Sequence, residues 1–160
     1  MTTAPADRST ARATPWWVRT GLDIQGGRLS IAGDDAEDLA RRHGTPLYVY
    51  DLARFGENAR TLRAGLARTG TPHVVRFALK ANREPEVLAV LRGLGDPGSP
   101  DSVGIDACSP GEVVHALAYG WRADEISYTG TNVSERDLDV LLDAGVHLNL
   151  DAVSQVERVG

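Results

Sequence analysis

The sequence predicts an α/β fold built around a parallel β-sheet. Short apolar segments alternate with longer segments in which apolar residues recur every three or four positions, the spacing of an amphipathic helix. Parallel neighbouring strands need a crossover connection of this kind, so the alternation favours a parallel sheet. The expected strands are residues 73–79, 103–107, 125–128 and 146–150, and the helices between them are residues 85–92, 110–119 and 134–143.

The number of expected strands leaves two architectures open. Four parallel strands could form a small doubly wound domain, or they could be the first half of a (β/α)8 barrel. The last expected strand, residues 146–150, ends close to Gly160, and we expect no further element that would close the sheet. We therefore expect an incomplete fold, and the alternation of strands and helices alone does not choose between the two architectures.

The chain ahead of the sheet divides into two parts. Residues 1–28 begin with a segment rich in Thr, Ala and Arg that lacks apolar periodicity, so we expect a disordered leader and lead-in. Residues 29–51 form a short N-terminal region, and a helix then opens the main unit, residues 52–160. The elements expected in the N-terminal region are strands at residues 29–31 and 47–50 and a short helix capped by Asp34 or Asp35.

Composition argues against several classes of function. A formal net charge of -5 does not supply the positive surface that binds a phosphate backbone, so we expect no nucleic-acid partner. The apolar runs are far shorter than the roughly 20 residues that span a bilayer, so we expect no membrane association. Cys108 is the only cysteine, which favours the reducing cytoplasm. The four histidines lack metal-ligand spacing, so we expect no metal site.

One basic residue differs from all the others. Of the 17 lysine and arginine residues, Lys80 is the only lysine. It lies at the carboxyl end of the expected strand 73–79, where barrel enzymes place catalytic side chains. A lysine amine can form a Schiff base with a carbonyl group, and arginine cannot. A surface lysine at a strand end is the simpler alternative, but it does not explain why every other basic position is arginine. We therefore predict a functional role for Lys80.

The residues around Lys80 resemble a known family. The segment from Phe77 to Asn82 is similar to the cofactor-lysine motif of the fold-type III pyridoxal-phosphate-dependent decarboxylases, which include the ornithine, diaminopimelate and arginine decarboxylases. The resemblance is greatest to the diaminopimelate branch. Further segments resemble the same family in the same order, at residues 45–51, 104–112, 128–132 and 149–152.

The resemblance implies a particular fold. It implies the N-terminal portion of a (β/α)8 TIM barrel of the alanine racemase-like type, incomplete in this chain. Residues 29–51 would then supply strands that join a later β-domain, and residues 52–160 would form the first half of the barrel. Two departures from the family pattern are an apparent insertion at residues 96–102 and Val133, which stands where many relatives carry lysine.

The resemblance also implies which residues contact a cofactor. The implied cofactor is pyridoxal 5'-phosphate, held by Lys80. Asp106 and Glu112 would face the cofactor region, where carboxylates orient polar groups. A position near a helix N-terminus is an alternative explanation for Glu112, because the helix dipole favours acidic residues there. Ala78 would precede Lys80 on the same strand face and leave room for a flat ring, although a small core residue would serve equally.

The activity implied is the decarboxylation of a small-molecule amino acid by a homodimer. The first-choice reaction is conversion of meso-diaminopimelate to L-lysine, and an ornithine or arginine type of reaction is the alternative. Two rivals remain from other classes. One is a non-catalytic pyridoxal-phosphate-binding barrel protein, and the other is a decayed homologue that regulates an active decarboxylase.

Overall fold

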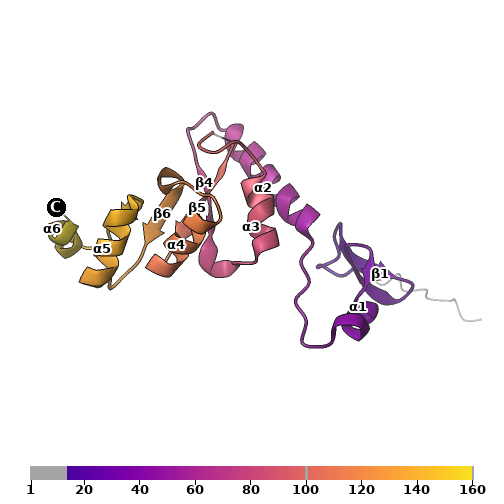
Figure 1. The fold of residues 1–160 in the computed structure, drawn as a ribbon. Helices are drawn as coiled ribbons and strands as arrows, with labels where there is room; N and C mark the ends of the chain where they lie inside the picture. Colours follow the sequence, from indigo (N-terminus) through magenta and orange to yellow (C-terminus); the bar gives the residue numbers. More distant parts are fainter. Residues whose placement is uncertain (1–13, 100, 160) are drawn as a thin grey trace, which may run out of the picture. The chain divides into compact units, whose positions relative to one another are not determined.

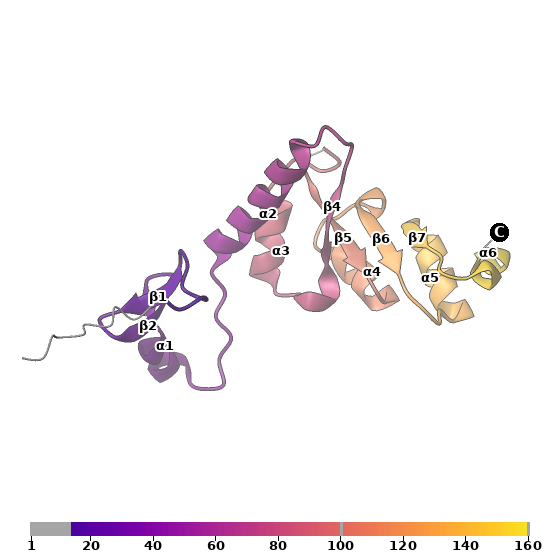
Figure 2. The ribbon, with the colours of Figure 1, turned by 180° about the vertical axis from the view of Figure 1, so that it is seen from behind.

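The computed structural model describes residues 14–99 and 101–159, so residues 1–13 of the predicted leader and lead-in lie outside the described residues. The chain divides into two units, Met1–Asp51 and Leu52–Gly160. Figures 1 and 2 show their elements from opposite sides. None of the helices in the described ranges has the length and apolar character needed to cross a membrane.

The first unit contains a small antiparallel sheet and one helix. Its strands are β1 (Leu22–Gln25), β2 (Arg28–Ile31) and β3 (Asp34–Asp35), and α1 (Ala36–His43) follows them. Gly26 and Gly27 join β1 to β2 with φ angles of 57° and 81°, and such a two-residue hairpin turn favours glycine. The side chain of Asp35 caps α1, because it accepts hydrogen bonds from two backbone amides in the first turn at 2.9 and 3.0 Å.

Two features of the first unit differ from the prediction. Strand β1 lies within residues 1–28, where we expected no strand, because a single four-residue strand carries little apolar alternation. The predicted strand at residues 47–50 is wrong, since these residues pair with no strand in the part of the chain that the structure describes. Their side chains are between 38% and 85% exposed. Apolar and aromatic residues favour β-structure, but a strand forms only where a second backbone pairs with it.

The second unit is a four-stranded parallel sheet, which confirms the predicted α/β fold (Figure 1). The strands lie side by side in chain order: β4 (Val75–Ala78), β5 (Val103–Ala107), β6 (Ile126–Thr129) and β7 (His147–Asn149). The α-helices are α2 (Leu52–Ala67), α3 (Pro85–Arg92), α4 (Pro110–Ala118), α5 (Glu135–Ala144) and α6 (Val153–Val159), and the short 3-10 helices are η1 (Leu79–Ala81) and η2 (Ala123–Glu125).

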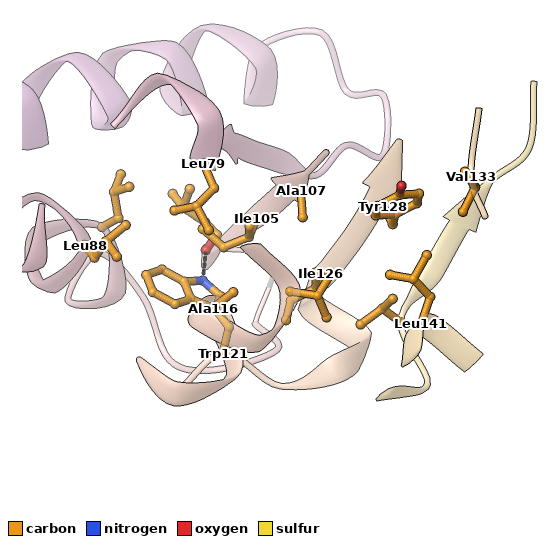
Figure 3. Close-up of a cluster of buried hydrophobic side chains, with 14 of the residues drawn as sticks. Leu79, Leu88, Ile105, Ala107, Ala116, Trp121, Ile126, Tyr128, Val133 and Leu141 are labelled. Atoms are coloured by element: carbon orange, nitrogen blue, oxygen red, sulfur yellow. Dashed lines mark hydrogen bonds between the residues drawn. The ribbon is translucent and has the colours of Figure 1, made fainter. Parts of the chain in front are cut away.

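The hydrophobic core of this unit lies between the sheet and its helices (Figure 3). Ile105 and Ile126 project from β5 and β6, and Leu88, Ala116 and Leu141 project toward them from α3, α4 and α5. All five side chains are 0% exposed. The core therefore occupies one face of the sheet, and the alternate residues of each strand lie on the opposite face.

Two boundaries in this unit differ from the prediction. The first strand of the parallel sheet is Val75–Ala78 and not residues 73–79, so Leu79 and Lys80 both lie in η1, which follows the strand directly. Helix α6 follows β7, although we expected no further element there. Gln155 of α6 accepts a hydrogen bond from the backbone amide of Asp151 at 3.0 Å, which stabilises the turn between β7 and α6.

The long connection between α3 and β5 is held by a buried carboxylate. Glu125 is 6% exposed and accepts hydrogen bonds from the backbone amides of Gly98 and Arg122, both at 2.9 Å. It also pairs with the Arg92 guanidinium at 3.2 Å. Gly98, within the apparent insertion, is thereby attached to the residue that precedes β6, at the amino end of the sheet.

Candidate cofactor-binding site

Polar side chains gather on the sheet face opposite the core, at the carboxyl ends of the strands. The strand register pairs Ala78 with Asp106, Asp106 with Ser127, and Thr129 with Asn149. Because side chains alternate between the two faces, these five positions share one face. Catalytic groups of (β/α)8 barrels come from this end of the strands, so this edge is the candidate site.

Lys80 is exposed and follows the first strand of the sheet. Its neighbour Leu79 is 0% exposed and belongs to the core, which fixes the backbone on which Lys80 stands. On the other side, the Asn82 side chain accepts a hydrogen bond from the backbone amide of Glu84 at 2.8 Å, just before α3 begins. In the described ranges Lys80 forms no ion pair.

Asp106 is half-buried and bonded to the neighbouring strand. Ser127 and Thr129 of β6 donate hydroxyl hydrogen bonds to Oδ1 of Asp106, at 3.2 and 3.0 Å. Asn149 of β7 in turn donates from Nδ2 to the Thr129 hydroxyl at 2.9 Å. The side chains of three consecutive strands are therefore linked at the carboxyl edge of the sheet.

Glu112 is 8% exposed and lies in the first turn of α4. Its Oε2 accepts a hydrogen bond from the backbone amide of Cys108 at 2.8 Å, and the Ser109 side chain caps the same helix. Glu112 therefore stabilises the turn that follows β5. This structural role agrees with the alternative explanation, in which an acidic residue is favoured near a helix N-terminus. A role toward the cofactor stays a prediction.

Ala78 is half-buried and pairs directly with Asp106 in the register. Its methyl group lies on the polar face, whereas its neighbour Phe77 packs against Phe55 of α2, with ring centroids 5.6 Å apart. Ala78, the last residue of β4 and two positions before Lys80, therefore lies next to Asp106 on the polar face. The small side chain leaves space beside the lysine.

A hollow of about 860 Å³ lies elsewhere, at the amino end of β4. It is lined by the end of α2, by residues around His73 and Val74, and by Ser99 and Asp101. Conserved chemistry in barrels comes from the opposite, carboxyl end of the strands, so we do not place the site in this hollow. In the part of the chain that the structure describes, no group of three or more His, Cys, Asp and Glu side chains is arranged to hold a metal ion.

Sequence reasoning did not assign Ser127, Thr129 and Asn149 to the site. The available signal was the alternation of polar and apolar residues in strands expected to be buried. In Ile126–Thr129, two polar residues alternate with Ile126 and Tyr128, and the polar pair faces away from the core. Such a pattern in a parallel strand, which is usually apolar on both faces, indicates a polar site on one side.

Residues 52–160 match the family described as pyridoxal-dependent decarboxylase, pyridoxal binding domain. This match covers more than half of the chain, and the chain therefore belongs to the pyridoxal-dependent decarboxylase family. The predicted family and the predicted cofactor, pyridoxal phosphate, are confirmed.

Individual relatives carry the name of one branch of the family. The chain is 45% identical over 133 residues to the diaminopimelate decarboxylase of Methanothermobacter thermautotrophicus, covering 83% of this chain and 29% of that protein. It is 37% identical over 136 residues to the diaminopimelate decarboxylase of Pseudomonas fluorescens, covering 84% of this chain and 30% of that protein. The chain spans about 30% of the length of these relatives.

Solved structures agree with the sequence comparisons. The structure of diaminopimelate decarboxylase from M. jannaschii in complex with L-lysine matches with a TM-score of 0.70 and 26% identity. The match covers 86% of this chain and 31% of that one. An ornithine decarboxylase from Entamoeba histolytica, at 24% identity and a TM-score of 0.50, shares the fold.

The residues at the carboxyl edge suit pyridoxal phosphate. A cofactor aldehyde requires a primary amine, and Lys80 is the single lysine of the chain. A flat ring requires space, which the methyl group of Ala78 allows. A polar ring edge requires an oriented carboxylate, and two hydroxyl groups hold Asp106 in place. Lys80 would therefore hold the cofactor, and Ala78 and Asp106 would line its site.

Proposed function

We propose that the protein to which these residues belong is a pyridoxal-phosphate-dependent decarboxylase that converts meso-diaminopimelate to L-lysine. The observation that carries the proposal is the position of Lys80, exposed and without an ion pair among the described residues, at the carboxyl end of β4 in a chain of this family. Relatives named diaminopimelate decarboxylase, up to 45% identical, support the choice of substrate.

The residues of this chain would divide the work between them. Bound pyridoxal phosphate supplies an electron sink for the bond that breaks as carbon dioxide leaves. Lys80 would hold the cofactor through its amine. Asp106, on the strand next to the one that precedes Lys80, would supply an oriented carboxylate, Ala78 would leave room for the ring, and Glu112 fixes the turn after β5.

The assembly and location belong to the same proposal. The family resemblance supports a homodimer, and the single cysteine supports the cytoplasm, where thiols stay reduced. Sedimentation of the complete protein at micromolar concentration would test the dimer. A monomer that retains full activity would contradict it.

The first experiment follows the cofactor to its attachment residue. Borohydride treatment of the complete, cofactor-loaded protein should fix the cofactor on the peptide that contains Lys80. Lys80→Arg keeps the charge but cannot form the covalent bond, so decarboxylation should fall at least about a thousandfold while the protein stays folded. Arg83→Lys is the matched control, because it exchanges the same two residue types at a nearby exposed position.

Three outcomes separate the proposal from its rivals. Labelling at Lys80 with release of carbon dioxide from diaminopimelate supports the proposal. Labelling at Lys80 without turnover of diaminopimelate, ornithine or arginine would indicate a non-catalytic cofactor-binding barrel. Labelling of the unaltered protein at a peptide without Lys80 would overturn the assignment. Labelling of the Arg83→Lys variant at position 83 in place of Lys80 would overturn it as well.

A further inference from the structure

We propose that Asn149 and Thr129 are positioning residues for Asp106, joined to it by a hydrogen-bond relay that crosses three strands. The relay holds Oδ1 of Asp106 and leaves Oδ2 for the centre formed by Lys80 and its cofactor. This inference rests on the proposed function of Lys80.

The geometry of the relay follows from the strand register. Asn149 pairs with Thr129 across β7 and β6, and Asp106 pairs with Ser127 across β5 and β6. The carboxylate of Asp106 bonds both to Ser127 and to Thr129, two residues further along β6, so it leans toward the carboxyl edge of the sheet. The successive donor-to-acceptor distances are 2.9 Å from Asn149 to Thr129 and 3.0 Å from Thr129 to Asp106.

The chemistry of the three groups gives the relay a direction. An ionised carboxylate only accepts hydrogen bonds, an amide nitrogen only donates them, and a hydroxyl group does both. When Nδ2 of Asn149 donates to the Thr129 oxygen, the hydroxyl proton of Thr129 is free to point toward Asp106. Asn149 therefore orients a hydroxyl group that lies one strand away from the carboxylate.

The two oxygens of Asp106 are used differently. Both hydroxyl donors, Ser127 and Thr129, bond to Oδ1. In the ranges that the structure describes, Oδ2 accepts no hydrogen bond. The two hydrogen bonds to Oδ1 fix the orientation of the carboxylate, and Oδ2 can still accept a hydrogen bond from another group. Because Asp106 pairs with Ala78, two residues before Lys80, the free acceptor lies at the lysine end of the sheet.

Stability of the fold does not explain this arrangement. Thr129 and Asn149 are exposed, and hydrogen bonds between exposed side chains add little to the free energy of unfolding. Barrel interiors are normally filled by branched apolar side chains, which would pack better at these positions. A row of hydrogen-bonding residues on adjacent strands is better suited to orienting a charged group.

The test changes the relay without touching Asp106 or Lys80. In the complete protein, Thr129→Val removes the hydroxyl group at constant shape, and Thr129→Ser keeps it. Asn149→Leu removes the amide donor at nearly constant shape and adds no charge, so the Thr129 hydroxyl loses the partner that orients its proton toward Asp106. Thr71→Val is the matched control, since this exposed threonine lies ahead of β4 at the other end of the sheet.

The readout is spectroscopic as well as kinetic. Misplacing a negative charge beside a protonated lysine–cofactor bond should shift the pH midpoint of its visible absorption band to lower pH. We expect this shift and about a tenfold loss of cofactor retention in Thr129→Val and Asn149→Leu, which corresponds to one charge-assisted hydrogen bond. Thr129→Ser and Thr71→Val should match the unaltered protein in both measurements.

The outcomes distinguish failure of the relay from failure of the proposed function. If borohydride labels Lys80 but neither relay variant shifts the band or weakens retention, the relay is refuted and the proposed function stands. If the cofactor is fixed at another residue, both are refuted. Equal losses in Thr129→Ser and Thr129→Val would show that packing, and not the hydroxyl group, is responsible, which also refutes the relay.

Discussion

Gly104 lies at a point in β5 where a side chain would meet neighbouring backbone. A Cβ atom there would lie 2.5 Å from the Glu125 carbonyl oxygen and 3.2 Å from Cγ of Arg76. The first contact involves backbone that cannot rotate away. Gly104 therefore allows β5 and the start of β6 to approach closely, and the register of Asp106 with Ser127 depends on that approach.

Gly104→Ala should therefore destabilise the protein by about 1–3 kcal/mol, the usual cost of overpacking a buried site. Gly65→Ala is the control, because Gly65 lies within α2 and a Cβ atom there would meet only the end of a flexible arginine at 3.7 Å. It should be neutral or stabilising by up to about 1 kcal/mol. Urea unfolding of the complete protein measures both values, and equal stability of the two variants would contradict the close approach.

Lys80 and the relay residues differ in how far the sequence alone indicates a function for them. A functional role for Lys80 could be predicted because it is the only lysine among 17 basic residues and because imine chemistry needs an amine. Thr129 and Asn149 are ordinary polar residues whose meaning depends on which strands are neighbours. That adjacency is set by the order β5, β6, β7, which local sequence pattern does not contain.

At the scale of elements, the network around Glu125 joins the α3–β5 connection to β6. Burial raises the pKa of Glu125, but the amides of Arg122 and Gly98 and the charge of Arg92 together hold it below its ordinary value of 4.5. Because the pKa is lower in the folded protein than in the unfolded chain, ionised Glu125 stabilises the fold above about pH 4.5. This contribution is lost as the pH falls through the folded-state pKa.

Glu125→Gln should consequently lower stability near pH 7 by roughly 2–4 kcal/mol, since it leaves Arg92 without its charged partner and weakens two amide bonds. The difference from the unaltered protein should shrink as the pH is lowered below 4.5. Asp124→Asn removes an adjacent, exposed carboxylate paired with Arg122 and should have little effect. Thermal melting of both proteins across this pH range measures the stability difference. A difference that grows as the pH falls would contradict a lowered pKa for Glu125.

Most elements of the second unit were predictable, and the exceptions have physical causes. The helices α3, α4 and α5 and the strands β4 to β7 lie where apolar periodicity placed them, within a few residues. The predicted strand at residues 47–50 failed because a strand depends on a partner as well as on composition. Helix α6 was missed because its exposed positions, such as Val153 at 79%, do not form a clear apolar face.

At the scale of the whole molecule, the sheet of the second unit is uncovered in two ways. Strands β4 and β7 each have one edge with no neighbouring strand in the described residues. The polar face that carries Asp106 and Thr129 has no layer packed on it within those residues, and Thr129 is exposed. Unpaired edges are templates for pairing with another chain. The relatives contain about three times as much chain as these 160 residues.

Residues 1–160 purified alone should therefore self-associate or form a loosely packed state, because the two open edges favour pairing between molecules. With added pyridoxal phosphate they should release no carbon dioxide from diaminopimelate, ornithine or arginine, since the described residues leave the face that carries Asp106 open to water. Size-exclusion chromatography, near-ultraviolet circular dichroism and a carbon dioxide assay test these expectations, with the complete protein as the control. A soluble monomer that melts cooperatively and decarboxylates one of these amino acids would show that 160 residues form a complete domain.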